Sequence, residues 1–420
     1  MESLGLISLI FLIAVVGLGF WRKINIGILA IGSAIILGKI GGIGDKAILQ
    51  GFDATMFITL VGVTFLFGIA QINGTLELLA KKAVALVGNK TYLVPIIIFI
   101  VTGVLSAIGP GNIPIGALMT VVAVTIAVYM KQNPILLALV AKLASNGFAM
   151  SPLTPAGIIG LRLGERAGYS NFIMPVMYNV ILWSLVLLVG FLILFRDKEK
   201  KVGDIKNIKI ENLETFDKNQ KITMTGIAVM MILVIGMGIN VGLASFFVAS
   251  ILLAMKVCNE KKALSSVPWG TLLLICGVGV LMNIVEQLGG IEIISKGLLS
   301  IMTPRTAAPI ISLTSSVLSF FSSTTGVVMP TMIPALPNIV HNFPGTVSFI
   351  ELQSVVITGS FSAAFSPAST GGGLILAAYM ASTDSTQEEQ NKLFGKLFTI
   401  AIGCVILNVA LSAIGLYKLF

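Results

Sequence analysis

Charged residues are scarce in this sequence. Only 11% of its 420 residues are Asp, Glu, Lys or Arg, whereas a soluble domain carries roughly 25%. Hydrophobic residues make up 56%, and the mean hydropathy is +1.01. Apolar runs of about 17 to 25 residues, the length that crosses the hydrocarbon core of a bilayer, recur along the chain. The sequence therefore excludes a soluble globular protein and predicts an all-α polytopic membrane protein.

Histidine and cysteine are also rare, which excludes several kinds of chemistry. The chain has one histidine, His341, and three widely separated cysteines, Cys258, Cys276 and Cys404. Their spacing fits neither a metal site nor a redox pair. The formal net charge of +9 is typical of Lys and Arg in cytoplasmic loops, and no basic run is interleaved with aromatic residues. We therefore expect neither a zinc site nor a nucleic-acid partner.

Acidic residues are missing from the interior of the predicted spans. Glu286 and Glu351, at predicted helix ends, come closest. Proton-driven exchangers usually carry carboxylates within the membrane. Their absence favours coupling to Na⁺ through neutral oxygens, or uncoupled anion movement, and disfavours cationic substrates. A channel would need a ring of charges, and an intramembrane enzyme would need a nucleophile beside a base. Neither pattern is present, so we expect no enzyme.

Three pairs of segments show that the chain contains an internal duplication. "GTLELLAKKA" from Gly74 matches "GGIEIISKGL" from Gly289. "VLSAIGPGN" matches "VLSFFSSTT", and "SPLTPAG" matches "SPASTGG", in the same order and at nearly the same separation along the chain. Internal repeats of this kind are common in secondary transporters. We predict a first repeat over residues 1–195, a charged linker over 196–221 and a second repeat over 222–420.

Each repeat is predicted to hold about five spanning helices, a re-entrant hairpin and a broken helix. The first hairpin has arms at 92–108 and 115–130, and the first broken helix covers 134–164 with its break at 147–155. If each hairpin returns to the side that it entered, the two repeats have inverted topology. The side of the linker then collects 19 of the 27 Lys and Arg, and the other side collects 7. This bias predicts a cytoplasmic linker and outward termini in the inner (plasma) membrane.

Four uncharged segments interrupt the predicted spans. All four are rich in Ser, Thr, Asn, Gly and Pro: Ser106–Gly116, Ser145–Pro155, Ser319–Pro330 and Ser360–Gly373. Irregular backbone at membrane depth is tolerated only inside protein or beside a cavity. The N-termini of half-helices bind anions, and unwound carbonyls can bind Na⁺. A packing kink explains one such break, but four related breaks favour a transport site.

Lys142 is the only charged residue inside a predicted spanning helix. Its ammonium group could pair with a substrate carboxylate, or it could snorkel to the cytoplasmic face about 12 Å away by helix rise. The equivalent position in the second repeat is Ile357. The duplication therefore does not decide between these two alternatives.

These residues resemble a known group of carriers. Two inverted repeats, each with a hairpin tip rich in Ser, Asn, Thr and Gly and a helix broken at a Pro-containing motif, look like the ion transporter superfamily. The chain is most similar there to divalent anion:sodium symporters and malonate/dicarboxylate carriers. The segment "FSPASTGGGLILAA", Phe365–Ala378, is the closest single resemblance. The symporters usually have a Ser-Asn-Thr tip in both hairpins, whereas this chain has "GPGN" and "SSTT".

The resemblance implies an elevator mechanism, a homodimer and a set of site residues. Hairpins and broken helices would form the moving domain, and the other helices a dimeric scaffold. The substrate-binding residues that it implies are Gly111, Asn112, Ser151, Thr154, Ser323, Thr324, Thr325, Ser366, Ser369 and Thr370, with Lys142 as an additional candidate. The candidate Na⁺ ligands are Asn112, Ser145, Asn146, Thr325 and Ser360.

The leading hypothesis is a secondary active transporter of small organic anions, di- or tricarboxylates, in the lipid bilayer, with Na⁺ as its coupling ion. The alternative is an exchanger or oxyanion exporter of the same fold, of the Na⁺/H⁺ or arsenite type. Growth on arsenite or at high sodium after deletion would separate the two.

Overall fold

Every regular element that the structure describes is a helix. The computed structural model describes residues 2–22, 24–85, 91–130, 132–195, 215–367, 369–382 and 387–420. Within them, five helical stretches are long and apolar enough to cross a membrane, and eight shorter apolar helices accompany them. The expected all-α polytopic architecture is confirmed. The predicted linker lies largely outside the described residues, because 196–214 are not among them.

The first half contains ten α-helices in the described residues, and their order follows the sequence prediction closely. They are α1 (Glu2–Arg22), α2 (Ile26–Ile40), α3 (Asp45–Gln50), α4 (Ala54–Ile72), α5 (Thr75–Ala85), α6 (Val94–Ala107), α7 (Asn112–Tyr129), α8 (Pro134–Gly147), α9 (Pro155–Arg166) and α10 (Ile173–Leu194). The predicted hairpin arms correspond to α6 and α7, and the broken helix to α8 and α9.

The second half repeats this order. Its elements are α11 (Lys218–Met237), α12 (Val241–Ala254), α13 (Glu260–Ser266), α14 (Trp269–Gln287), α15 (Gly290–Leu299), α16 (Ala307–Phe321), the π-helical turn η4 (Thr324–Val328), α17 (Met329–Met332), the 3₁₀ turn η5 (Ile333–Ala335), α18 (Leu336–Asn342), α19 (Phe349–Ala363), α20 (Thr370–Ser382) and α21 (Gln387–Ala413). The second hairpin is therefore α16 with a return arm that starts at η4, and the second broken helix is α19 with α20. The short helices α3 and α13 were not predicted, because each is a polar segment of six or seven residues.

The helix caps carry a further trace of the duplication. Asn25 caps α2 by accepting a hydrogen bond from the Gly27 N–H at 2.9 Å. Asn240, its counterpart in the second half, caps α12 by accepting from the Gly242 N–H at 2.9 Å. Asn side chains are favoured at this position because they satisfy N–H groups that have no partner within the helix. The same cap therefore starts the second helix of both halves.

Two pairs of glycines join helices of the first half to helices of the second half, and the two contacts are equivalent in the register of the repeat. A Cβ on Gly277 of α14 would lie 2.3 Å from the Gly27 carbonyl oxygen on α2. A Cβ on Gly62 of α4 would lie 2.3 Å from the Gly242 carbonyl oxygen on α12. In the register of the repeat, Gly27 corresponds to Gly242 and Gly62 to Gly277. Small residues allow such close helix approach in membrane proteins. Each half thus gives the other an equivalent pair of packed helices.

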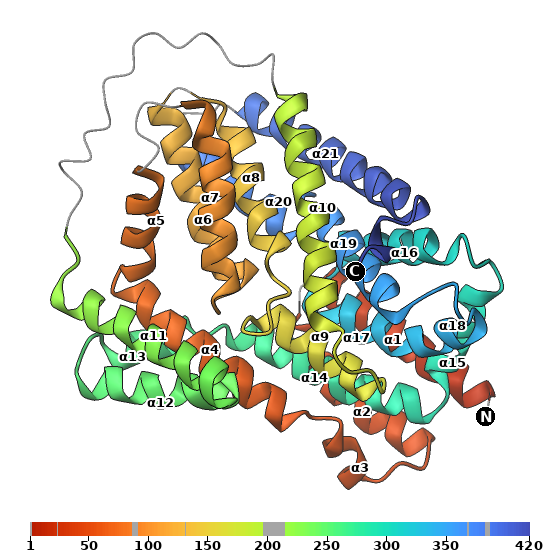
Figure 1. The fold of residues 1–420 in the computed structure, drawn as a ribbon. Coiled ribbons are helices and arrows are strands. Elements are labelled where there is room, and N and C mark those ends of the chain that lie inside the picture. Colours follow the sequence, from red (N-terminus) through yellow and green to blue (C-terminus); the bar gives the residue numbers. More distant parts are fainter. Residues whose placement is uncertain are drawn as a thin grey trace.

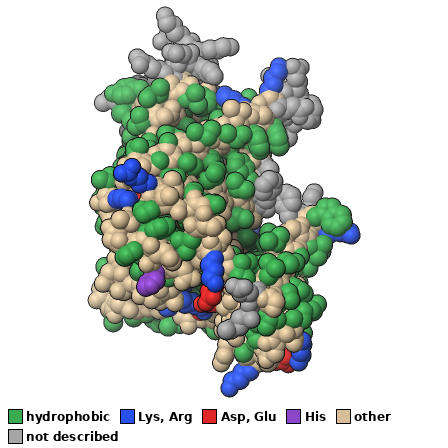
Figure 2. Space-filling model, turned by 90° about the vertical axis from the view of Figure 1, so that its right-hand side faces the viewer, with side chains coloured by type: hydrophobic (Ala, Val, Ile, Leu, Met, Phe, Trp, Pro, Cys, Tyr) green, Lys and Arg blue, Asp and Glu red, His purple; other side chains and the backbone are tan. Residues whose placement is uncertain are grey.

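Figure 1 shows the resulting arrangement. α4, α11 and α12 run along the lower edge of the molecule, and α6, α7, α8 and α10 stand above them at a steep angle. On the face in Figure 2, hydrophobic side chains form broad areas and acidic side chains are few. Strongly exposed apolar residues include Ile232 and Ile235 of α11, which are 64% and 71% exposed. Such a surface suits contact with lipid.

Candidate anion-binding site

The first hairpin turns within four residues because two of them are glycine. α6 ends at Ala107 and α7 begins at Asn112. Gly111 has φ +79°, a left-handed conformation that favours glycine. A Cβ on Gly109 would lie 2.0 Å from the ring of Phe67 on α4. The "GPG" sequence therefore lets the tip reverse while packed directly against α4.

The second hairpin turns through serine. Ser322 is extended, and the Ser323 hydroxyl accepts a hydrogen bond from the Gly326 N–H at 3.2 Å, which caps η4. The turn therefore presents the start of a helical segment, with Ser323, Thr324 and Thr325 in sequence, at the tip.

An equivalent serine in each half attaches the hairpin to the broken helix of that half. The Ser106 hydroxyl of α6 donates to the Ser145 carbonyl of α8 at 2.9 Å. The Ser319 hydroxyl of α16 donates to the Ser360 carbonyl of α19, also at 2.9 Å. The "VLS" segments that match in sequence thus hold equivalent places. Ser145 and Ser360 are equivalent residues of opposite halves, so as Na⁺ ligands they would serve two separate sites.

The breaks in the two broken helices are closed by one hydroxyl group each. Thr154 accepts from the Gly157 N–H at 3.1 Å and donates to the carbonyls of Ser151 and Ala149. Ser369 does the same in the second half, accepting from the Gly372 N–H and donating to Ser366 and Ala364. These hydroxyls are occupied by backbone groups. The helices α9 and α20 therefore start at equivalent capped positions.

A small polar cavity of about 70 Å³ lies where the second hairpin, the α19–α20 break and α7 and α8 meet. Of the residues predicted from sequence, seven line it: Asn112, Lys142, Asn146, Ser323, Thr324, Thr325 and Ser369. Several others lie elsewhere. Gly111 faces Pro155, Ser151 lines a separate cavity of about 520 Å³, and Thr154 and Ser366 are fully buried. Thr370 begins α20, but its side chain is outside the described part of the structure.

The cavity also includes residues that the sequence did not single out: Ile113, Ser319, Ser322, Phe361, Ala364, Gly371 and Leu374. Ser319 could have been found, because it matches Ser106 in the "VLS" pair. Phe361 could also have been found by register, as the counterpart of Asn146. The remaining apolar lining residues could not have been found, because apolar residues are common throughout this sequence.

Lys142 reaches into this cavity and does not snorkel. Its side chain is only 4% exposed, and its ammonium nitrogen lies 3.4 Å from the Asn112 carbonyl oxygen at the first hairpin tip. Among the described residues, no carboxylate lies within salt-bridge distance of it. The buried acid Glu351 instead pairs with Lys418, at 3.8 Å. Lys142 is therefore a buried cation without a protein counter-ion in the described part of the chain.

Hydrogen-bond donors surround the same cavity. The Asn112 amide donates to the Asn146 side-chain oxygen at 3.0 Å, so the Asn146 NH₂ group faces the other way. That NH₂ group is buried and has no partner in the described structure. η4 and α20 both begin at the cavity wall, and the first N–H groups of a helix have no partner within the helix. An ammonium group and the starts of two helical segments together favour an anion.

Comparisons with known proteins agree with a carrier. Residues 2–149 match the family model "Dicarboxylate carrier protein MatC N-terminus". No curated protein sequence is similar enough to count as a match.

Two solved structures share the fold. The YdaH transporter of Alcanivorax borkumensis, described as having an unusual topology, is 12% identical with a TM-score of 0.57, over 88% of this chain and 87% of YdaH. MtrF of Neisseria gonorrhoeae, described with a class of antimetabolite efflux pumps, is 14% identical with a TM-score of 0.56, over 88% of this chain and 82% of MtrF. The comparisons indicate a membrane transporter and not an enzyme.

Proposed function

We propose that the protein is a secondary active transporter of small organic anions, specifically di- or tricarboxylates. The observation that carries this proposal is the unpaired ammonium group of Lys142 in a cavity lined by neutral donors. A charge buried in the membrane without a partner costs several kcal/mol. A substrate carboxylate in the cavity would remove that cost. The match of the first third of the chain to a dicarboxylate carrier family supports the same class of substrate.

Uptake by the purified full-length protein in proteoliposomes tests the proposal. We expect saturable uptake of at least one of malonate, succinate, malate and citrate, and no uptake by protein-free liposomes. Absence of uptake of all four anions, with the protein folded and reconstituted, would overturn the proposed substrate class. Transport of arsenite instead would favour the oxyanion exporter.

We further propose that transport is coupled to Na⁺. Hydroxyl groups of Ser319, Ser322, Ser323 and Thr324 gather at the second hairpin tip and line the cavity. Neutral oxygens of this kind suit a hard cation. The Ser360 hydroxyl, just beyond the wall, is buried without a hydrogen-bond partner in the described structure. Among the described residues that line the cavity there is no Asp or Glu that could carry a proton instead.

An inward Na⁺ gradient is therefore expected to raise the initial uptake rate at least about tenfold over an equal K⁺ gradient. The measurement is uptake of the best anion with external NaCl or KCl at constant pH and membrane potential. Equal rates in both salts would exclude Na⁺ coupling while leaving anion transport intact.

The proposed mechanism is of the elevator type, in a homodimer of the plasma membrane with inverted repeats and a cytoplasmic linker. In support, each hairpin is hydrogen-bonded to its own broken helix, while glycine contacts join α2 to α14 and α4 to α12. An elevator motion would require the hairpins and broken helices to slide as one body against these helix pairs. A cysteine at Ser323 should react with an impermeant thiol reagent from both sides of the membrane. Reaction from one side only, whatever the substrate gradient, would contradict alternating access there.

A further inference from the structure

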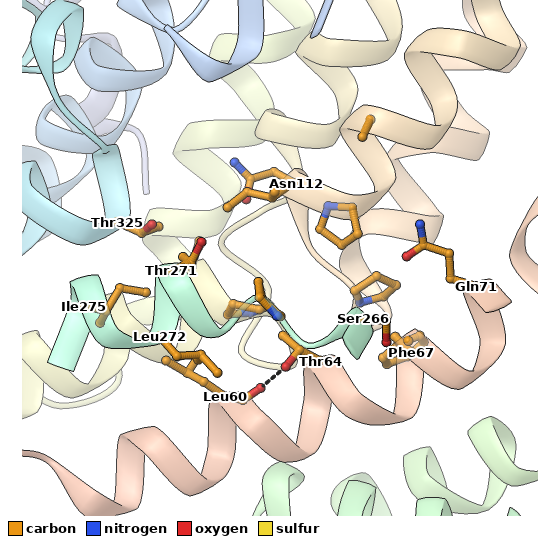
Figure 3. A pocket seen from close by; sticks show the side chains of 18 of the residues that line it. Leu60, Thr64, Phe67, Gln71, Asn112, Ser266, Thr271, Leu272, Ile275 and Thr325 are labelled. Atoms are coloured by element: carbon orange, nitrogen blue, oxygen red, sulfur yellow. Dashed lines mark hydrogen bonds between the residues drawn. The ribbon is translucent and has the colours of Figure 1, made fainter. Parts of the chain in front are cut away.

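A second cavity adjoins the polar one. It has a volume of about 220 Å³ and lies between the first hairpin and helices α4 and α14. Figure 3 shows Asn112 and Thr325 on one side of it, with Leu60 and Leu272 on the other. It is about three times the size of the cavity that holds Lys142.

The walls of this second cavity are mainly apolar. Leu60 and Phe67 come from α4, and Leu272 and Ile275 from α14. No Lys, Arg, Asp or Glu is among the residues that line it. Of its few hydroxyls, that of Thr64 donates to the Leu60 carbonyl at 2.8 Å and is thereby satisfied (Figure 3). A carboxylate placed here would find no cation, whereas a hydrocarbon group would leave water for an apolar surface.

The two cavities share part of their walls. Asn112, Ile113 and Thr325 line both of them. The two cavities are therefore adjacent, and the side chains at the two hairpin tips lie between them. One bound molecule would then meet a charged subsite and an uncharged one.

We propose that the preferred substrate is a carboxylate that carries an uncharged, largely apolar substituent. This inference rests on the proposed function and deepens it. The carboxylate end binds in the Lys142 cavity, and the substituent fills the cavity between the first hairpin and α4 and α14. A bare dicarboxylate occupies only the first subsite and binds more weakly.

Competition by a series of substituted malonates tests this inference. The probes are malonate, ethylmalonate, butylmalonate and benzylmalonate. The readout is the concentration of each that gives half of its maximal rise in melting temperature, or that halves the uptake of a labelled anion. Each buried methylene is worth about a fourfold gain in affinity, so butylmalonate should bind at least about tenfold more tightly than malonate. The inference is overturned if malonate binds but the affinity stays constant or falls from malonate to the larger members of the series. Failure of every member to bind overturns the proposed function instead.

A cavity-filling variant locates the effect. Ala117 of α7 lines the apolar cavity but not the polar one. In Ala117→Leu, affinity for malonate should stay within about twofold, while the advantage of butylmalonate should disappear. The control is Thr125→Leu on the exposed face of the same helix, which should keep the full advantage. Retention of the advantage in a folded Ala117→Leu protein would place the substituent elsewhere and overturn the inference.

Discussion

Replacing Lys142 with Gln should abolish most anion binding while making the empty protein more stable. Removing one partner of a buried charge pair costs about 2 to 5 kcal/mol, so the affinity for the best anion should fall at least about 30-fold. The substitution should instead stabilise the ligand-free protein, because the variant no longer buries an ammonium group that lacks a counter-ion in the described structure. The melting temperature of the ligand-free protein should therefore rise, and the increase on adding substrate should vanish.

Both effects are measured in one thermal-shift experiment in detergent, with and without the anion. Lys39→Gln is the matched control, because Lys39 is exposed and pairs with Asp45 only at the surface. It should change neither quantity measurably. If Lys142→Gln lowered the stability of the ligand-free protein and left anion affinity intact, Lys142 would be a structural residue.

Gly157→Ala should disrupt the first broken helix. A Cβ at this position would lie 1.9 Å from the Ser151 carbonyl oxygen, a backbone atom that cannot turn away. The added methyl group would also displace the Gly157 N–H, which donates a hydrogen bond to the Thr154 hydroxyl. Loss of a cap combined with a severe clash should cost at least about 3 kcal/mol. We expect a large fall in melting temperature or loss of folded protein on size-exclusion chromatography.

Gly190→Ala on α10 is the control for the glycine substitution itself. Nothing lies within 4 Å of a Cβ at Gly190, so the added methyl group should leave stability unchanged or raise it slightly. Gly372→Ala should behave like Gly157→Ala, because its Cβ would lie 2.3 Å from the Ser366 carbonyl oxygen. A stable Gly157→Ala protein would show that the break is not held by this close approach.

The places where the helices break could be predicted from sequence, because Pro, Gly and capping hydroxyls act locally. "SPLTPAG" contains the Thr154 cap and the Pro155 start of α9 within two residues. The α6–α7 turn likewise follows from its glycines. The short helices α3 and α13 could not be predicted in this way, since neither has an apolar period or the length of a membrane span.

Which hydroxyls face the cavity could not be predicted, because this depends on the path of the backbone through each break. Thr154 and Ser369 occupy equivalent capping positions, yet only Ser369 lines the polar cavity. Lys142 was undecided for a related reason. Its flexible side chain can extend along the helix toward the membrane surface or sideways into the cavity, and only the position of the Asn112 carbonyl in space distinguishes the two.

The presence of Lys142 in only one of the two halves affects the orientation of a bound ligand. A frame made of two equivalent halves would accept an unsymmetrical molecule in two opposite orientations of equal energy. Position 142 is Lys in one half, whereas its counterpart in the other is Ile357, and this difference removes the degeneracy. The carboxylate end of an unsymmetrical substrate would therefore always lie on the Lys142 side, and the proposed transport cycle would carry the molecule in one orientation.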